Sequence, residues 1–284
     1  MTAKTLPKPE IDTALLADAL IARGAQVLVI PWDDLEPSAE WDAVVIRSTW
    51  DYHGRREEFL AWTRAVTAVT RLINPIDDIL WTSHKAYVAD LPAMGVPAIP
   101  TLVLSQGEAL AASTSGAVAA WLGKHRESTD FVVKPAVSVG GFGAERVLAA
   151  DVVDAVIRVG GGGDVVVQPL IESVLEYGEV SLVLFDGVVH HAVRKVGASG
   201  EFLIHDHHGG RVLPHDPTPD EIAVAAVAIA VAPSPPLYAR VDMLRGPEGP
   251  LVIEIELIEP QLFLEVHPEA PDRLAQVLLR ALET

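Results

Sequence analysis

The sequence predicts a mixed fold of the α/β or α+β class, built as two or three packed lobes. Apolar runs bounded by turn residues recur along the chain and alternate with segments of helical period, which is typical of such folds. The chain has 284 residues, half of them hydrophobic, and can therefore bury a sizeable core. The opening segment also has the order of elements of a small doubly wound domain.

The first unit, residues 1–95, is predicted to be this doubly wound N-terminal domain. Its first strand is short, because only Met1 to Leu6 precede Pro7. Gly24 marks a turn, and Gly95 ends the last helix of the unit. The predicted elements are a helix at 12–23, strands at 26–30 and 43–47, a helix at 57–70 and a helix at 83–94.

Two further units are predicted, a central lobe at 96–167 and a C-terminal lobe at 168–284. In the second of these, Asp186-Gly187 separates two apolar runs and predicts an antiparallel hairpin. The central elements are strand 99–104, helix 108–123, strand 131–135, helix 150–159 and strand 164–168. The C-terminal elements are the hairpin strands 180–185 and 188–194, helix 220–232, strands 237–244 and 251–257, and a closing helix.

Composition excludes several classes of partner. The formal charge of -18, from 39 acidic and 21 basic residues, argues against binding nucleic acid or an anionic membrane surface. The chain has no cysteine, so it can form neither a disulfide nor a thiolate zinc site. Its N-terminus lacks the apolar core of a signal peptide, and its longest apolar run, at 222–232, is too short to cross a bilayer. We therefore expect a cytoplasmic protein that binds small molecules.

An acidic cluster near the C-terminus is the strongest candidate site. Glu254 and Glu256 are two residues apart on a predicted strand and share one face, and Asp242 ends the preceding strand. If the two strands pair, the three carboxylates offer hard oxygen ligands for Mg²⁺. The alternative is a solvent-exposed edge strand, but the apolar neighbours indicate a partly buried sheet, where unpaired acids are costly.

A second candidate site is the strand 131–135, which places Lys134 directly before a loop rich in glycine and serine. Backbone amides of such a loop can approach phosphate oxygens while the lysine supplies a point charge. A glycine-rich loop is also common as a plain turn, and the sequence does not match the P-loop pattern GxxxxGK[ST].

Five motifs in order resemble the ATP-grasp superfamily over nearly the whole chain. They are Lys85, Val133-Lys134-Pro135 with the loop Ser138 to Gly143, Val167 to Ile171, Asp242, and Glu254-Ile255-Glu256. Within the superfamily, the segments Arg47 to His53 and Glu256 to Pro260 are similar to the cycloserine-biosynthesis branch, of the O-ureido-D-serine cyclo-ligase type. The resemblance implies a glutathione synthetase-like ATP-grasp fold, in which an N-terminal domain and two α+β lobes clamp the nucleotide.

The resemblance also implies a role for individual residues. Glu179 is similar to the acid that binds ribose, with Glu176 as a competing candidate. The residues that would bind ATP are Lys85, Lys134, the flap residues Ser138, Gly140, Gly141, Phe142 and Gly143, the hinge residues Gln168, Pro169, Leu170 and Ile171, and Glu179. Lys195, with its neighbour Arg194 as a rival, and Arg240 would be catalytic.

Asp242, Glu254 and Glu256 match the metal positions of the superfamily. Magnesium is the expected ion, with Mn²⁺ as a second candidate. The chain departs from the pattern at Glu256, where asparagine is usual, and at Leu203, where glutathione synthetase-like members have a substrate-binding arginine. A substrate of the glutathione type is therefore disfavoured.

Candidate substrate contacts come from three segments. The first follows a predicted parallel strand, where α/β domains place ligand-binding loops. The candidates are Arg47, Ser48, Asp51 and His53 in this segment, His205, His207 and Arg211 in a His-rich loop, and Glu259 in the motif 256–260. Trp50 and Tyr52 are equally well explained as core residues, and the His-rich loop as a metal site or a solvated loop.

The activity that the resemblance implies is ATP-dependent ligation of a carboxylate to an amine through an acylphosphate. The substrate would be a small amino-acid-like carboxylate, and in the cyclo-ligase branch ring closure would be intramolecular. Two alternatives remain, an ATP-grasp protein that binds nucleotide without turnover and an α/β module that binds a metal or a sugar. A homodimer is compatible with the sequence, which indicates neither the identity nor the stereochemistry of the substrate.

Overall fold

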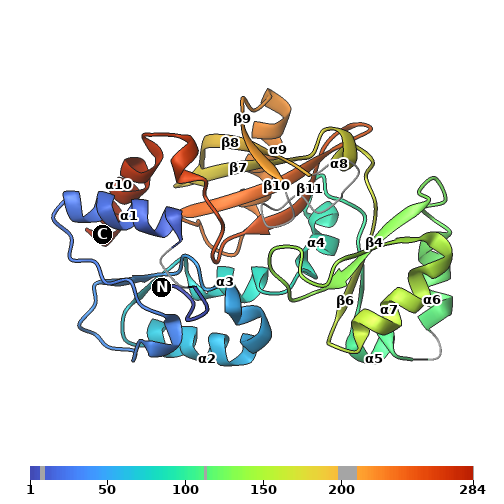
Figure 1. Cartoon of the computed structure of the whole chain (residues 1–284), viewed down its shortest axis with the longest axis horizontal. Coiled ribbons are helices and arrows are strands. Elements are labelled where there is room, and N and C mark those ends of the chain that lie inside the picture. The colour runs from blue at the N-terminus through green and yellow to red at the C-terminus, as the bar shows by residue number, and fades with distance from the viewer. Residues whose placement is uncertain (7–9, 112–113, 198–209, 284) are drawn as a thin grey trace.

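The structure, a computed structural model, describes residues 1–6, 10–111, 114–197 and 210–283. Three sheets organise these residues, with two, four and five strands. Figure 1 shows the five-stranded sheet above, the small two-stranded unit below it and the four-stranded lobe to one side. The predicted mixed α/β class is confirmed.

The N-terminal unit is a small parallel α/β arrangement. Strands β1 and β2 pair in parallel, and single bridges join Thr2 to Pro31 and to Ser48. The predicted strand at 26–30 is not formed. The amide of Thr2 donates to the carbonyl of Ile30 at 3.1 Å, but no described strand pairs with the rest of this segment. The elements are α1 (Ile11–Ala22), η1 (Trp32–Asp34), β1 (Ala43–Val45), η2 (Trp50–Arg55), α2 (Arg56–Thr67), β2 (Arg71–Ile73), α3 (Ile76–Thr82), α4 (Tyr87–Asp90) and η3 (Leu91–Met94).

The helix predicted at 83–94 is shorter than expected. Ser83 closes α3, and the next helix begins only at Tyr87 and tightens into the 3₁₀ turn η3. Pro92 lies in that turn and cannot donate the hydrogen bond that would continue an α-helix. Gly95 ends the segment with a φ of 83°, as predicted. Lys85 therefore lies on a turn between two helices, from which its side chain contacts Glu254 of the five-stranded sheet and Ser138 after strand β4 (Asp130–Pro135) of the four-stranded sheet.

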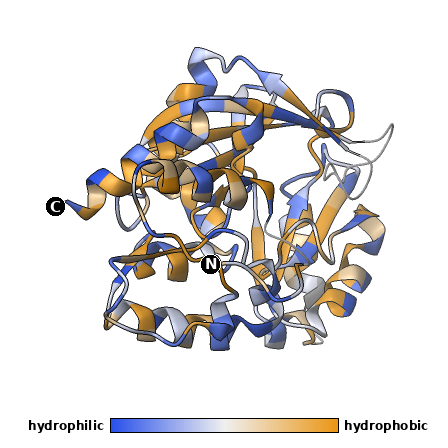
Figure 2. Ribbon diagram, turned by 60° about the vertical axis from the view of Figure 1, so that its left-hand side comes forward, coloured by the Kyte–Doolittle hydropathy of each residue, from blue (hydrophilic) through white to orange (hydrophobic). Residues whose placement is uncertain are grey.

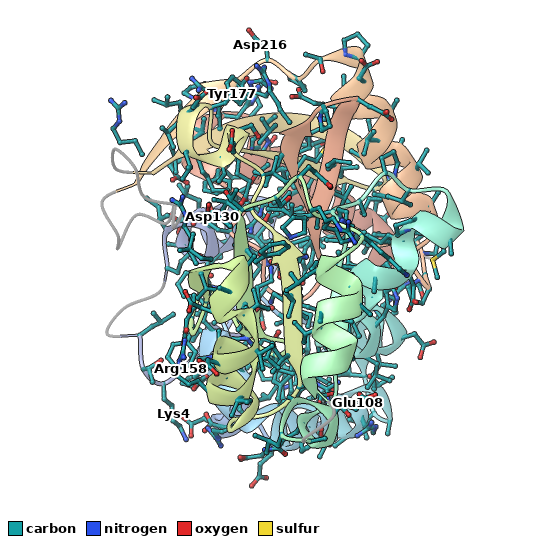
Figure 3. The ribbon with its side chains drawn as sticks, turned by 90° about the vertical axis from the view of Figure 1, so that its right-hand side faces the viewer. Lys4, Glu108, Asp130, Arg158, Tyr177 and Asp216 are labelled. Carbon is teal, nitrogen blue, oxygen red and sulfur yellow. The ribbon has the colours of Figure 1, made fainter. Side chains whose placement is uncertain are left out.

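The central lobe is an antiparallel sheet in the order β3-β6-β4-β5. Figure 3, in which this lobe faces the viewer, shows it below the five-stranded sheet, with Arg158 and Glu108 towards its far end. Phe131 and Val133 of β4 pack against Val152 and Val156 of α7 in a core of its own. The elements are β3 (Leu102–Leu104), α5 (Gln106–Ala109), α6 (Thr114–Leu122), β4 (Asp130–Pro135), β5 (Glu145–Leu148), η4 (Ala149–Asp151), α7 (Val152–Gly160) and β6 (Val165–Pro169).

The C-terminal lobe is an antiparallel sheet in the order β11-β10-β7-β8-β9. The predicted hairpin is confirmed, since Asp186 and Gly187 both have positive φ, of 53° and 74°, between β7 and β8. The elements are α8 (Ser173–Glu176), β7 (Glu179–Phe185), β8 (Val188–Val196), β9 (Arg211–His215), α9 (Pro219–Ala230), β10 (Tyr238–Gly246), β11 (Gly249–Glu256), η6 (Leu264–Val266) and α10 (Ala270–Leu282).

The first and last units share a hydrophobic core. Leu16 of α1 and Ile73 of β2 belong to one buried cluster with Phe185 and Leu274 of the C-terminal unit, and α1 lies beside α10 (Figure 1). Figure 2 shows apolar residues along the strands and on helix faces turned towards them. Within the part of the chain that the structure describes, no helix is long and apolar enough to cross a membrane.

Candidate active site

A large cavity lies between the four-stranded and the five-stranded sheets, with a volume of about 1060 Å³. Its walls come from β4, β6, β10 and β11, from the turn at Lys85 and from the N-terminal segment 50–53. Among the described residues, six carboxylates and four cationic side chains line it, which leaves a formal charge of -2. A triphosphate would add further negative charge, so the cavity suits a nucleotide only together with cations.

The three predicted metal-binding carboxylates lie close together on the cavity wall formed by β10 and β11. Asp242 of β10 is the direct cross-strand partner of Glu254 on β11, and Glu256 lies two residues further along β11. An irregularity follows directly after Asp242 and shifts the register of the two strands. The expected alignment of the acidic strands is therefore present, and all three side chains line the cavity.

Arginine neutralises two of these carboxylates. The guanidinium of Arg240 donates from Nε and Nη2 to both oxygens of Asp242, at 2.8 and 2.7 Å, and its Nη2 also pairs with Glu256. Ser181 donates a third hydrogen bond to Asp242, at 2.6 Å. Burial raises the pKa of Asp242, but Arg240 and Lys195 outweigh it and hold that pKa below its ordinary value. Asp242 is thus ionised, as a metal ligand must be.

The oxygen donors fit a hard cation, but in this state they are bound to protein cations. No group of three or more His, Asp or Glu side chains within the described ranges is arranged to hold a metal ion. Asp242 and Glu256 pair with Arg240, and Glu254 pairs with Lys85. Binding of Mg²⁺ would therefore exchange these ion pairs for metal contacts.

Lys85 connects the acidic cluster to the flap. Its Nζ lies 2.9 Å from Oε1 of Glu254 and donates to the carbonyl oxygen of Ser138 at 2.6 Å. The backbone amide of Lys85 also donates to the carbonyl of Ala136 at 2.8 Å. Burial raises the pKa of Glu254, but Lys85 and Lys134 outweigh it and lower the pKa below its ordinary value.

Lys134 projects from β4 into the same cavity. Within the described part of the chain it makes no hydrogen bond or ion pair, although Glu254 lies close enough to favour its charged form. Burial lowers the pKa of Lys134 because the ammonium loses its hydration. A half-buried ammonium without a partner is suited to bind a phosphate.

Lys195 and Arg194 point to opposite sides of β8. Lys195 lines the cavity, forms an ion pair with Glu179 and lies 3.5 Å from Asp242. Arg194 does not line the cavity, and instead donates to the carbonyl oxygen of Tyr177 at 2.9 Å and lies over its ring. The structure therefore places Lys195, and not its rival Arg194, with the predicted catalytic residues.

Glu179 lies where it was expected, at the start of β7 and within the cavity wall. Burial raises its pKa, and the nearby Lys195 opposes this shift. The competing candidate Glu176 is exposed on α8 and does not line the cavity.

The predicted hinge lies in the cavity wall beside a cluster of apolar side chains. Gln168, Pro169, Leu170 and Ile171 all line the cavity. The amide of Leu170 already donates to the carbonyl oxygen of Asp130, at 2.9 Å. Sequence reasoning missed other apolar residues that line the cavity, because single apolar residues carry no motif: Ile99, Val132, Val174, Leu244 and Ile253.

The flap is the connection between β4 and β5, and all five of its predicted residues line the cavity. Gly140, Gly141 and Gly143 have positive φ. A Cβ on Gly143 would come within 2.9 Å of the ring of Pro135, so this position requires glycine. Phe142 is 64% exposed, and its ring lies 5.2 Å from that of His53. The flap thus meets the N-terminal unit across the mouth of the cavity.

The predicted substrate residues divide into two groups. Asp51, His53 and Glu259 line the cavity, as do Trp50 and Tyr52. Arg47 and Ser48 do not line it, because their side chains are buried behind the site, where Arg47 donates to the carbonyl of Pro260 at 2.7 Å. The structure therefore does not support the prediction that Arg47 and Ser48 contact the substrate.

The His-rich loop contributes little to the described site. Arg211 is exposed at the start of β9 and does not line the cavity. His205 and His207 lie outside the described residues. His84, beside Lys85, is half-buried and hydrogen-bonds to Asp164 at 3.2 Å.

Asp12 supports the site from behind and was missed by sequence reasoning. It accepts hydrogen bonds from the amides of Leu262, Phe263 and Leu264, at 2.6, 3.0 and 2.7 Å. Phe263 has a φ of 50° and lines the cavity. The contact joins residues 250 positions apart, so no local pattern could reveal it.

Comparisons with known proteins identify the family of the chain. Residues 1–74 match the family described as D-cycloserine synthetase DcsG, N-terminal domain. The chain is 37% identical to the cycloserine biosynthesis protein DcsG of Streptomyces lavendulae, over 96% of this chain and 95% of that protein. It is also similar to the crystal structure of D-cycloserine synthetase DcsG, with a TM-score of 0.89 and 34% identity over 99% of this chain and 98% of that one.

A more distant likeness shows the fold. The ATP-grasp ligase PsnB, in complex with a phosphomimetic variant of its minimal precursor, Mg and ADP, gives a TM-score of 0.67 at 18% identity, over 98% of this chain and 96% of that one. The fold and the site therefore define an ATP-grasp ligase: two sheets enclose the cavity, Lys85 and Lys134 line it, and acidic residues lie on its strands. Within that class, the chain belongs to the family of the cycloserine biosynthesis protein DcsG.

Proposed function

We propose that this ATP-grasp ligase activates the carboxylate of a small amino-acid-like molecule as an acylphosphate and closes it to a cyclic amide of the D-cycloserine type. The observation that carries the proposal is the placement of Lys85, Lys134, Lys195 and Arg240 around the Asp242–Glu254 pair in one cavity. The family supports the D-cycloserine type of product, and the resemblance of the segments 47–53 and 256–260 favours O-ureido-D-serine as the substrate.

The first step is phosphoryl transfer, which requires positioning and charge neutralisation. An oxygen of the substrate carboxylate attacks the γ-phosphorus of ATP, and the bond to the β,γ-bridging oxygen breaks to release ADP. Lys134 and Lys85 would bind the phosphates, and Asp242, Glu254 and Glu256 would hold magnesium. When bound, the metal supplies positive charge against the phosphate oxygens.

The second step forms the amide. A nitrogen of the same molecule attacks the acyl carbon and loses its proton, and the carbon–oxygen bond to phosphate then breaks. With O-ureido-D-serine the ring nitrogen still carries the carbamoyl group, so water must then cleave that carbon–nitrogen bond, which releases ammonia and carbon dioxide and leaves the D-cycloserine ring. Arg240 and Lys195 border the cavity beside Asp242 and would stabilise the oxyanion of the tetrahedral intermediate. Phe142 and His53 meet at the mouth of the cavity, so flap closure would protect the acylphosphate from water.

The proposal is tested by measuring ADP and phosphate release with Mg-ATP and a panel of serine-derived carboxylates, O-ureido-D-serine first, with mass spectrometry of the products. We expect substrate-dependent release of one ADP per ring closed, and its loss in Glu254→Gln. Binding of Mg-ATP without ADP release for any member of the panel would overturn the proposal in favour of a nucleotide-binding protein without turnover.

A further inference from the structure

Glu259 differs from every other carboxylate in the cavity. It is 7% exposed and lines the cavity just after β11. Among the described residues, no other residue donates a hydrogen bond to its side chain, and no lysine, arginine or histidine forms an ion pair with it. The other cavity-lining acids have partners: Lys195 for Glu179, Arg240 for Asp242 and Glu256, Lys85 for Glu254, and the indole of Trp32 for Asp51.

A buried carboxylate without a partner is costly, and a cation from a ligand would remove that cost. Burial, followed by the neighbouring Glu256, raises the pKa of Glu259 to about 8, and the charge of Lys85 offsets only part of this shift. At neutral pH the Glu259 carboxyl is therefore largely protonated in the free site, and a positively charged partner would favour its ionised form.

The surroundings of Glu259 favour an organic ammonium over a metal ion. Trp50 and Tyr52 line the cavity beside it, and the indole of Trp50 donates to the backbone carbonyl of Glu259 at 3.2 Å. Aromatic side chains beside a carboxylate are a common setting for ammonium recognition. A divalent cation would instead require several oxygen ligands.

The backbone around Glu259 is held firmly. Arg47 donates to the carbonyl of Pro260 at 2.7 Å, and the hydroxyl of Tyr238 donates to the carbonyl of Ile258 at 3.0 Å. The carboxylate is thus presented from a fixed segment, which lowers the entropic cost of binding a ligand.

We infer that Glu259 binds the cationic amine of the substrate, so that the site selects zwitterionic amino acids over carboxylates that lack an amine. For the class of ligand, the inference rests on the proposed function. The substrate carboxylate would then lie towards Arg240 and Lys195, which line the same cavity, and the amine beside Glu259 and the N-terminal segment 50–53.

The test compares D-cycloserine with isoxazolidin-3-one, which has the same ring without the exocyclic amine. Binding is measured by calorimetry with Mg-ADP present. We expect wild type to bind D-cycloserine at least tenfold more tightly, and Glu259→Gln to bring the two affinities within about threefold of each other, because a charge-assisted hydrogen bond is lost. Glu259→Asp should keep part of the preference.

Two controls show that the variant is folded and its nucleotide site intact. Mg-ADP affinity should be unchanged in Glu259→Gln, and Glu248→Gln, an exposed change in the β10–β11 turn, should behave as wild type. Equal affinities in wild type, no binding of either probe, or an undiminished preference in Glu259→Gln would each overturn the inference. If Glu259→Gln loses the amine preference of the wild type, but the wild type releases no ADP with any carboxylate, the proposed reaction is refuted and the amine-binding role of Glu259 still stands.

Discussion

The side-chain nitrogen of Lys85 lies 2.9 Å from Oε1 of Glu254 and 2.6 Å from the carbonyl oxygen of Ser138. One ammonium therefore links strand β11, which carries two of the predicted metal ligands, to the flap between β4 and β5. A phosphate would compete for the Lys85 ammonium and a magnesium ion for Glu254, so we expect nucleotide binding to be coupled to the position of the flap.

Glu254→Gln should remove turnover and leave the fold intact. The amide keeps the shape of the side chain but cannot supply the negative charge that holds magnesium or pairs with Lys85. We expect kcat to fall at least about 100-fold, with a higher Mg²⁺ requirement in steady-state kinetics. Glu248→Gln on the same hairpin is the control, and a wild-type dependence on Mg²⁺ in Glu254→Gln would refute the metal assignment.

Lys134→Met should weaken nucleotide binding without destabilising the free protein. Loss of a charge-assisted contact predicts a tenfold to hundredfold higher Kd for Mg-ATP, measured by calorimetry. The free energy of unfolding without ligand should not decrease, since burial already disfavours the Lys134 ammonium and lowers its pKa. Lys124→Met, an exposed change in the same lobe, provides the comparison. An unchanged Kd in Lys134→Met would contradict the assignment.

Lys195→Met and Arg194→Met should have opposite consequences, although the residues are adjacent. Lys195 lies in the cavity with Glu179 and Asp242, whereas Arg194 lies against Tyr177 outside it. We expect kcat/KM to fall at least about 100-fold in Lys195→Met and to stay within about threefold of wild type in Arg194→Met. Equal losses in both variants would show that the strand face is assigned incorrectly.

Asp12→Asn should destabilise the protein by about 2–4 kcal/mol. The carboxylate is fully buried and accepts three backbone hydrogen bonds from residues 262–264, and an amide group would place a donor against those N–H groups. The measurement is urea unfolding, with the exposed Asp18→Asn on the same helix as the matched change. Equal stability of the two variants would mean that the 262–264 loop does not depend on this anchor.

Asp78 should give the stability of the protein a distinct pH dependence. It is fully buried, and burial raises its pKa to about 6. A raised pKa in the folded state means that its contribution is favourable below the ordinary value of 3.8 and is lost as the pH rises through about 6. The unfolding free energy of Asp78→Asn relative to wild type should therefore increase by about 2 kcal/mol between pH 4 and pH 7.

The check for Asp78 is a series of denaturant titrations across that pH range. The neighbouring Asp77 is exposed, so Asp77→Asn should show a nearly flat difference. A flat difference for Asp78→Asn as well would show that the carboxylate is hydrated in solution.

The sequence alone determined the fold class and most of the residues that face the cavity. Alternation of period two brings Glu254 and Glu256 to one face of a strand, and the Asp186-Gly187 turn specifies its hairpin, because both features depend on residues close together in the chain. The order of five motifs then identified the ATP-grasp class, as the structural comparisons confirm.

Only the tertiary structure decided which face of β8 lines the cavity. It showed that Lys195 lies in the cavity and that Arg194 lies outside it. It also showed that Arg47 supports the loop that carries Glu259 rather than lining the site, and that Asp12 anchors a loop 250 residues away. The physical reason is that local spacing fixes which residues share a face, whereas the partner of each face is set by the packing of elements distant in sequence.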